Sequence, residues 1–425
     1  MAAVFAAIVF VVSFILIMSE KLNRAAVALF GGVIFLLTGI YDTTEEFMSY
    51  INWDTIALIF SMMVLVSIAQ KTNMFYFAGI RFAKLVNGSP VPLFIGISLI
   101  VAAGSALLDN VTTVLIFVPI MLQMGRVLQL PLFPYLLMII LSSNVGGAAT
   151  LIGDPPNIMI GQAVSGLDFM SFVIHLAPLA MLNLLVIIIL GVMLFKKELH
   201  QTDIKIDNLM TIDEYAALKR TPLLYKSLVV LSMTLLAFSL HSVINVDITT
   251  VAISGAVLLL LWADHELDTE AVFSQVEWVT LFFFIGLFTL VGGLEEVGVI
   301  GWIAETIMAY TEGAVDKTSL TILWTAGILS GLVDNIPFVA AMIPVIEEFQ
   351  YHGISNLDPI WWSLALGACL GGNATLIGAS ANIVVAGLAE GANQRIPFIK
   401  YMLYGIPAVL ISLTLSTLYI IIRYL

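Results

Sequence analysis

The segment Leu108-Asp109-Asn110 recurs as Val333-Asp334-Asn335, and we call the separation between Asp109 and Asp334 the repeat offset. The same offset relates rarer residues, without a gap from Trp53 to Asn157: Trp53 with Trp278, Pro119 with Pro344, Gly146-Gly147 with Gly371-Gly372, Thr150-Leu151-Ile152-Gly153 with Thr375-Leu376-Ile377-Gly378, and Asn157 with Asn382. Chance similarity between apolar segments does not keep Trp, Pro and Asn in one register over such a length. We therefore predict two copies of one structural repeat.

The composition predicts a membrane protein, because hydrophobic residues make up 60% of the chain and charged residues only 11%. A single soluble core does not hide that much apolar surface. Apolar runs near the length of about 20 residues that a spanning helix needs occur at 2–18, 54–70, 169–195, 224–243, 278–294 and 399–422. The continuous run from Leu184 to Leu190 contradicts the alternating pattern of a barrel strand. We predict an all-α polytopic protein in a lipid bilayer.

Charge and cysteine content exclude several functional classes. The formal net charge is −13, but the acidic residues lie mainly in short loops, and no basic tract suggests nucleic acid. Cys369 is the only cysteine, which excludes an internal disulfide and a multi-cysteine metal cage. No Gly-x-x-x-x-Gly-Lys nucleotide-binding loop is present. We predict no metal and no cofactor, and we expect the segment 2–18 to be a retained helix and not a cleaved signal peptide.

Lysine and arginine, which favour cytoplasmic loops, are distributed differently in the two halves. In the first half they follow the predicted helices, at Lys21, Arg24, Lys71, Arg81, Lys84, Arg126, Lys196 and Lys197. The matching loops of the second half, 245–248, 295–318 and 347–358, contain only Lys317. Equivalent loops are thus expected on opposite sides of the membrane, so the repeats are predicted to have inverted topology, with both termini outside.

Each repeat is predicted to contain about five transmembrane helices, a re-entrant hairpin and one broken helix. The predicted divisions are a first transmembrane repeat at 1–195, a cytoplasmic linker at 196–226 and a second, inverted transmembrane repeat at 227–425. The sequence does not define an oligomeric state.

One polar cluster interrupts an apolar run in each half. The cluster consists of Asp109, Asn110, Thr112 and Thr113 in the first half and of Asp334 and Asn335 in the second. A charged side chain at bilayer depth is unfavourable by about 2.5–3.5 kcal/mol, so such residues are functional candidates. We expect each cluster to form the tip of a re-entrant hairpin that faces protein near the bilayer midplane.

A second polar cluster in each half opposes a continuous helix. Its candidate residues are Asn144, Gly146, Gly147, Thr150, Asp154 and Asn157 in the first half and Gly371, Gly372, Asn373, Thr375 and Asn382 in the second. A break here frees backbone carbonyls and half-helix N-termini, which bind a cation and an oxyanion respectively. Close helix packing is the alternative explanation for the small residues Ser142, Ser143, Ala149 and Ser330.

These motifs carry a family resemblance. They read Leu108-Asp109-Asn110-Val111-Thr112-Thr113, Gly146-Gly147-Ala148-Ala149-Thr150 with Ile152-Gly153-Asp154-Pro155-Pro156-Asn157, and Leu366-Gly367-Ala368-Cys369-Leu370-Gly371-Gly372-Asn373 with Ile377-Gly378-Ala379-Ser380-Ala381-Asn382. The chain resembles the ion-transporter superfamily, in the branch of ArsB-type arsenite permeases (arsenical pump membrane proteins), NhaD-type sodium/proton antiporters and P-protein-like permeases. The resemblance implies a secondary transporter of the inner (cytoplasmic) membrane, and arsenical permeases can pair with a soluble ATPase subunit.

The expected function is arsenite or antimonite efflux coupled to proton entry by alternating access. In this hypothesis Asp109 and Asp334 exchange protons. The solute is bound by the amide and hydroxyl groups of Asn110, Thr112, Asn144, Asn335 and Asn373. Arsenite is largely an uncharged trihydroxide, which suits a site that the sequence predicts to lack lysine and arginine.

Three other functions are alternatives. A sodium/proton antiporter of the NhaD type is the main one, since two acids and free carbonyls also describe a sodium site. A passive anion channel is a second. An intramembrane aspartyl protease is disfavoured because no Gly-x-Gly-Asp motif surrounds Asp109, Asp154 or Asp334, so no enzymatic activity is expected.

Overall fold

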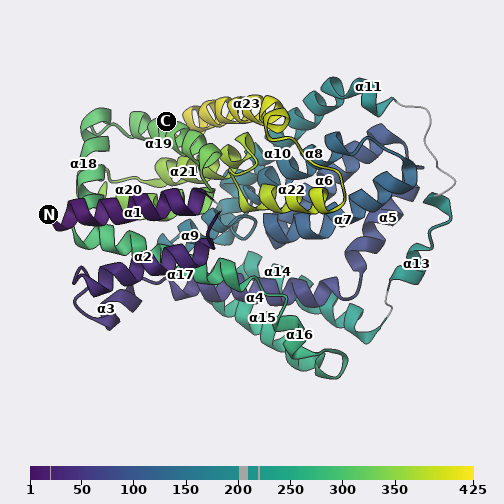
Figure 1. Ribbon diagram of the computed structural model, residues 1–425, viewed down its shortest axis with the longest axis horizontal. Coiled ribbons are helices and arrows are strands. Elements are labelled where there is room, and N and C mark those ends of the chain that lie inside the picture. Colours follow the sequence, from purple (N-terminus) through teal and green to yellow (C-terminus); the bar gives the residue numbers. More distant parts are fainter. Residues whose placement is uncertain (20, 201–208, 219–220) are drawn as a thin grey trace.

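The computed structural model describes residues 1–19, 21–200, 209–218 and 221–425, and within these ranges it contains helices and no strand (Figure 1). The first half contains α1 (Ala2–Met18), α2 (Arg24–Leu37), α3 (Thr44–Ser49), α4 (Trp53–Gln70), α5 (Met74–Leu85), α6 (Pro90–Leu108), α7 (Asn110–Leu128), α8 (Leu132–Gly147), α9 (Pro155–Ala163) and α10 (Phe169–Leu194). The short helices α11 (Lys196–Leu199) and α13 (Glu214–Ala217) follow.

The second half repeats this order. It contains α14 (Pro222–Ile244), α15 (Ile248–Trp262), α16 (Thr269–Phe273), α17 (Trp278–Glu296), α18 (Val299–Thr311), α19 (Val315–Leu332), α20 (Asn335–Glu348), α21 (Asp358–Gly371), α22 (Ser380–Gly391) and α23 (Phe398–Tyr424). Two 3₁₀ turns lie between these helices, η1 (Asp264–Glu266) and η2 (Gly372–Ala374).

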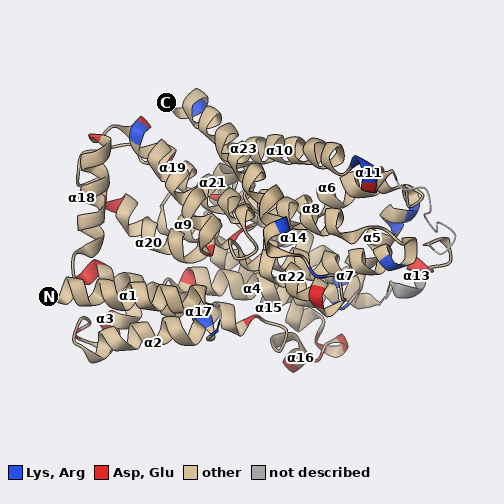
Figure 2. Cartoon of the chain, turned by 45° about the horizontal axis from the view of Figure 1, so that its top comes forward, with Lys and Arg blue, Asp and Glu red and all other residues tan. Residues whose placement is uncertain are grey.

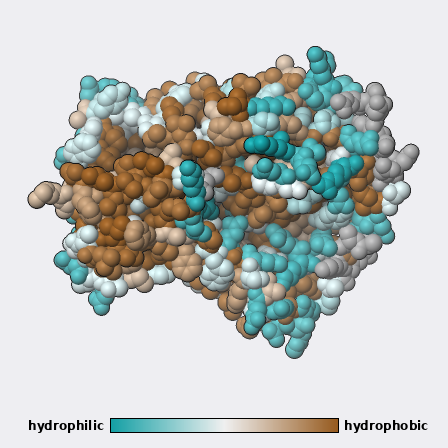
Figure 3. Space-filling view, in the orientation of Figure 1, coloured by the Kyte–Doolittle hydropathy of each residue, from teal (hydrophilic) through white to brown (hydrophobic). Residues whose placement is uncertain are grey.

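The chain is a multi-pass membrane protein. Seven of the described helices are long and apolar enough to span a membrane: α4, α6, α7, α10, α14, α17 and α23. Large apolar side chains also cover the surface of α1 and α2, where Figure 3 shows a broad hydrophobic area. Phe30 is 65% exposed and Ile8 is 56% exposed there. An apolar surface of this extent is stable in contact with lipid but not with water.

The two halves run in opposite directions. Trp53 begins α4 and its equivalent Trp278 begins α17. α4 leads into α5 and α17 leads into α18, and Figure 1 shows α5 and α18 at opposite ends of the molecule. Both termini lie in the half of the view that contains α18. The predicted inverted repeats are therefore confirmed.

Equivalent contacts recur at the repeat offset. The Ser105 hydroxyl donates to the carbonyl oxygen of Ser143 at 2.5 Å, and the Ser330 hydroxyl donates to that of Ala368 at 2.6 Å. These bonds join α6 to α8 and α19 to α21. No side chain separates the helices at the crossings, because a Cβ atom on Gly146 or Gly371 would overlap the backbone of Ala102 or Gly327. The glycines predicted at the helix breaks are thus required by packing.

Part of the predicted linker 196–226 is held against α5. Residues 201–208 and 219–220 of this segment lie outside the described residues. In the described part, Glu214 accepts a hydrogen bond from Lys84 and lies 3.3 Å from Arg81. Figure 2 shows this basic end of the molecule, which contains α5, α11 and α13. The Lys84 hydrogen bond holds the pKa of the Glu214 carboxyl below its ordinary value.

Substituting Gly371→Ala should lower the apparent Tm in detergent, although alanine favours helices. The added methyl group overlaps the Gly327 backbone, and overpacking of this kind costs about 1–3 kcal/mol. Gly387→Ala on α22 is the matched control, since nothing lies within 4 Å of its Cβ position. A Gly371→Ala variant as stable as the control would contradict the close crossing.

Glu214→Gln should speed trypsin cleavage within 196–226 at neutral pH, because the ion pairs with Lys84 and Arg81 are lost. The pKa of the Glu214 carboxyl is lower in the folded chain than in the unfolded chain. The ionised carboxylate therefore stabilises the contact at pH values above the unfolded pKa, and this stabilisation is lost as the pH falls through the folded pKa. The native chain should therefore release the segment only at acidic pH. Glu312→Gln, which breaks the exposed pair with Lys317, is the control; equal cleavage of both variants at neutral pH would refute the docking.

Candidate functional site

The two helical hairpins turn at the predicted aspartates. Asp109 alone separates α6 from α7, with φ = 127°, and a non-glycine residue keeps such a strained backbone only where its surroundings enforce it. Its Oδ1 accepts from the Thr112 N–H at 2.7 Å and its Oδ2 accepts from the Thr112 hydroxyl at 2.6 Å. Asp334 caps α20 in the same way, by accepting from the Ile336 N–H at 3.2 Å. Both carboxylates thus lie at helix N-termini, where a negative charge is favoured.

Both predicted helix breaks are present. α8 ends at Gly147 and α9 begins at Pro155, while α21 ends at Gly371 and α22 begins at Ser380. The Asn157 amide donates to the Thr150 carbonyl at 2.9 Å, and the equivalent Asn382 amide donates to the Thr375 carbonyl at 2.9 Å. The two asparagines therefore replace backbone hydrogen bonds that each break removes.

Asn144 joins the two broken helices at the centre of the molecule. Its amide group donates to Oδ1 of Asn373 and to Oδ1 of Asn382, both at 2.9 Å, and its Oδ1 accepts from Asn110 at 3.3 Å. All four side chains are buried. Among the described residues, Asn110 Oδ1 and Asn373 Nδ2 of this cluster have no hydrogen-bond partner, and Thr113 Oγ1 on α7 also has none. Buried polar atoms are rarely left unpaired, so this amide cluster retains acceptors and donors for a ligand.

Asp154 is fully buried and lies between the halves. Both of its carboxylate oxygens accept from the Asn335 amide, at 3.2 Å each. Asn335 begins α20 in the second half, so this contact connects the second hairpin to the first broken helix. The Cys369 thiol of the second half donates to Oδ1 of Asn157, which lies three residues after Asp154, at 3.5 Å. A carboxylate in such a position is stable only if it is paired, hydrogen-bonded or protonated.

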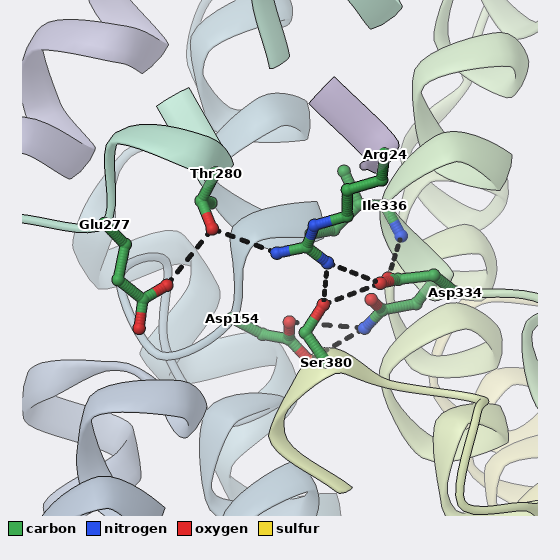
Figure 4. A network of polar contacts seen from close by, with 8 residues as sticks. Arg24, Asp154, Glu277, Thr280, Asp334, Ile336 and Ser380 are labelled. Carbon is green, nitrogen blue, oxygen red and sulfur yellow. Dashed lines mark hydrogen bonds and ion pairs between the residues drawn. The ribbon is translucent and has the colours of Figure 1, made fainter. Parts of the chain in front are cut away.

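The prediction that the site lacks lysine and arginine is wrong. Arg24 was expected in a loop, but it is the first residue of α2 and its guanidinium extends into the interior (Figure 4). It lies 3.4 Å from Asp334 Oδ2, and it donates to Ser380 Oγ at 2.6 Å and to Thr280 Oγ1 at 3.0 Å. The Ser380 hydroxyl donates in turn to Asp334 Oδ2 at 2.6 Å. The contact joins residues 310 positions apart, so no local pattern indicates it.

Two adjoining cavities bring the charged groups together. The larger, of about 320 Å³, is lined by Arg24, Glu277, Asp334 and Ser380 among apolar side chains. The smaller, of about 30 Å³, shares Arg24, Glu277 and Ser380 with it and adds Asp109. Glu277 accepts from the Thr280 hydroxyl at 3.1 Å. Acidic groups therefore outnumber the single arginine around these cavities.

Several predicted site residues have contacts that explain them as structural. The Thr150 and Thr375 hydroxyls donate to the carbonyls of Ala106 and Gly331, at 2.5 and 2.7 Å, and so hold each break against its hairpin. The Gly147 and Gly372 positions are crowded by backbone atoms. Sequence reasoning missed Arg24, Glu277, Thr280 and Ser380. One signal was available for Ser380, which occupies the position equivalent to Pro155 in an otherwise matching motif.

Comparison with known proteins places these features in a wider group. A family model described as "Citrate transporter" matches residues 14–367. An uncharacterised transporter of Mycobacterium tuberculosis is 37% identical over 427 residues, which cover 99% of each chain. The P protein of Homo sapiens is 31% identical over 490 residues, covering 96% of this chain and 58% of that protein. The YdaH transporter of Alcanivorax borkumensis, whose crystal structure was described as having an unusual topology, shares the fold with a TM-score of 0.61 at 11% identity, covering 98% of this chain and 97% of that one.

The Arg24–Asp334 pair should show energetic coupling in a double-mutant cycle. Arg24→Gln should destabilise the protein by leaving the largely buried Asp334 unpaired, and adding Asp334→Asn should recover most of that loss. We expect a coupling energy of about 0.5–3 kcal/mol from unfolding in mild detergent. The exposed pair Lys317–Glu312 should couple by less than about 1 kcal/mol. Additive effects of the two site variants would show that the pair contributes no stability.

Proposed function

The chain belongs to the citrate transporter family of membrane proteins, and from this premise we propose that it is a proton-coupled secondary active transporter that works by alternating access. The observation that carries the proposal is the excess of acidic groups in the interior. Asp109, Asp154, Asp334 and Glu277 lie in or beside the two cavities, and among the described residues Arg24 is the single basic side chain that lines them. Ionised carboxylates at bilayer depth are strongly disfavoured, so binding of protons is the simplest way to neutralise them during a transport cycle.

The two hairpin aspartates are proposed to differ in role. Asp334 has a fixed counter-charge in Arg24. The position equivalent to Arg24 at the repeat offset is Thr249, so the duplication supplies Asp109 with no corresponding cation. Asp109 and Asp154 are therefore the proposed proton carriers. Asp334 would exchange a proton only when Arg24 moves away.

The proposed solute is arsenite or antimonite, exported across the cytoplasmic membrane as protons enter. An uncharged trihydroxide both donates and accepts hydrogen bonds. The amide cluster offers matching groups in Asn110 Oδ1 and Asn373 Nδ2, which are unpaired among the described residues. Because Asp334 pairs with Arg24, the described lining of the cavities presents no free cation that would select an anion.

A second candidate, transport of a carboxylate anion such as citrate, is favoured by one observation. Arg24 donates to Ser380, the first residue of α22. A guanidinium beside a half-helix N-terminus suits an oxyanion. In this alternative, protonation of Asp334 would release Arg24 to bind the substrate.

Proton flux into proteoliposomes that contain an internal pH dye tests both candidates. Arsenite or antimonite should drive a pH change that Asp109→Asn and Asp154→Asn abolish, because the proton carriers are removed. Asp316→Asn, at an exposed position on α19, should leave the flux unchanged. Arg24→Gln should leave arsenite-driven proton flux unchanged.

Other outcomes of this assay select a different function. A response to citrate that Arg24→Gln abolishes would favour the second candidate. A response to sodium or lithium alone would identify an antiporter of the NhaD kind. Solute movement without any proton flux would overturn the coupling mechanism.

A further inference from the structure

An apolar groove lies on the outer surface of α8, α10 and α23, away from the charged cavities. It has a volume of about 320 Å³. Its floor is formed by the buried side chains of Met138 and Ile187, and its rims by Leu194 and Leu403, which are 63% and 69% exposed. A groove that is apolar throughout and opens at the surface of a membrane protein faces hydrocarbon chains.

One end of this groove carries three aromatic rings in mutual contact and a group of lysines. The ring of Tyr404 lies 5.0 Å from that of Phe195 and 5.8 Å from that of Phe133. The ammonium of Lys400 lies 3.9 Å from the centre of the Phe133 ring. Lys196 and Lys197 follow Phe195 directly and are exposed.

These three lysines are available to a ligand. None of Lys196, Lys197 and Lys400 forms an ion pair with an acidic group of the described residues. The nearest acid in the sequence, Glu198, lies on α11 beside Lys197. Three cations at the end of an apolar groove, separated from it by aromatic rings, match a molecule with a negative head and an apolar tail. Basic pockets between transmembrane helices bind lipid head groups in this way.

We propose that this groove binds one anionic phospholipid, with an acyl chain between α10 and α23 and its phosphate beside Lys196, Lys197 and Lys400. The lipid would also contact α8 through Leu137, Met138 and Leu141. α8 carries Asn144, the residue that joins the two broken helices. The bound lipid therefore stabilises the helix on which the central amide cluster depends.

Binding can be measured on the purified full-length chain in detergent. Phosphatidylglycerol and phosphatidylcholine with identical acyl chains are added separately, and retained lipid is counted by native mass spectrometry while the apparent Tm is recorded. Phosphatidylglycerol should be retained and should raise the Tm by several degrees more than phosphatidylcholine. The combined variant Lys196→Gln, Lys197→Gln and Lys400→Gln should abolish this difference, whereas the control Lys317→Gln, an exposed lysine at the other end, should keep it.

The acyl-chain part of the site is tested by filling the groove. Ala408→Phe, or Ile411→Phe if the first variant does not fold, should reduce retention of phosphatidylglycerol while the lysines remain. Equal retention of the two lipids by the native chain would overturn the proposal. So would an equal Tm shift from inorganic phosphate alone, or a lipid-free dimer in which a second copy fills the groove. The readouts are binding and stability, so they are independent of the transported solute.

Discussion

In hydrocarbon, backbone groups have no water to bind, so a transmembrane helix can be interrupted only where other protein groups replace its lost hydrogen bonds. Asn157 and Asn382 do this by donating to carbonyls of the two interrupted segments. The hydroxyls of Thr150 and Thr375 then fix each segment to the neighbouring hairpin. Because these bonds hold the irregular backbone in place, Asp154, Ser380 and the half-helix N-termini can meet the hairpin aspartates in the interior.

The duplication supplies a symmetric framework, and divergence between its halves supplies the chemistry. At the repeat offset Asn144 corresponds to Cys369, Asp154 to Ala379, and Arg24 to Thr249. Each of these three differences places a carboxamide, a carboxylate or a guanidinium on one side of the pseudo-symmetric centre only. The site therefore has one asparagine that joins the two broken helices, one additional buried acid and one guanidinium. Inverted repeats with such unequal halves can still exchange conformations, which is the usual basis of alternating access.

The sequence alone was sufficient to predict the repeat, because Trp, Pro and Asn keep one register in both halves. It also predicted the hairpins and the broken helices, because Asp in an apolar run and Gly-Gly in a helix are unfavourable without a structural or functional reason. It also identified Asp109, Asp334, Asn144 and Asn335, which lie in the interior as expected. It failed for Arg24, since a cation near the end of an apolar segment resembles an ordinary loop residue. The packing of α2 against α17 places Arg24 beside Thr280, and its contacts with Asp334 and Ser380 come from two further segments that lie far away in the sequence. Thr150 and Thr375 were predicted as site residues. Their hydroxyls donate to backbone carbonyls, and these contacts depend on helix positions that periodicity does not give.

Cysteine labelling shows whether the interior between the two halves opens to one side of the membrane at a time. Val111 lines both cavities, and the native Cys369 is buried, so Val111→Cys can be made in a Cys369→Ser background. A membrane-impermeant maleimide is applied to one or the other side of oriented proteoliposomes, with and without an imposed proton gradient. If the protein works by alternating access, Val111→Cys is labelled from one side at a time, and the gradient changes the accessible side. Simultaneous labelling from both sides would indicate an open channel and rule out alternating access.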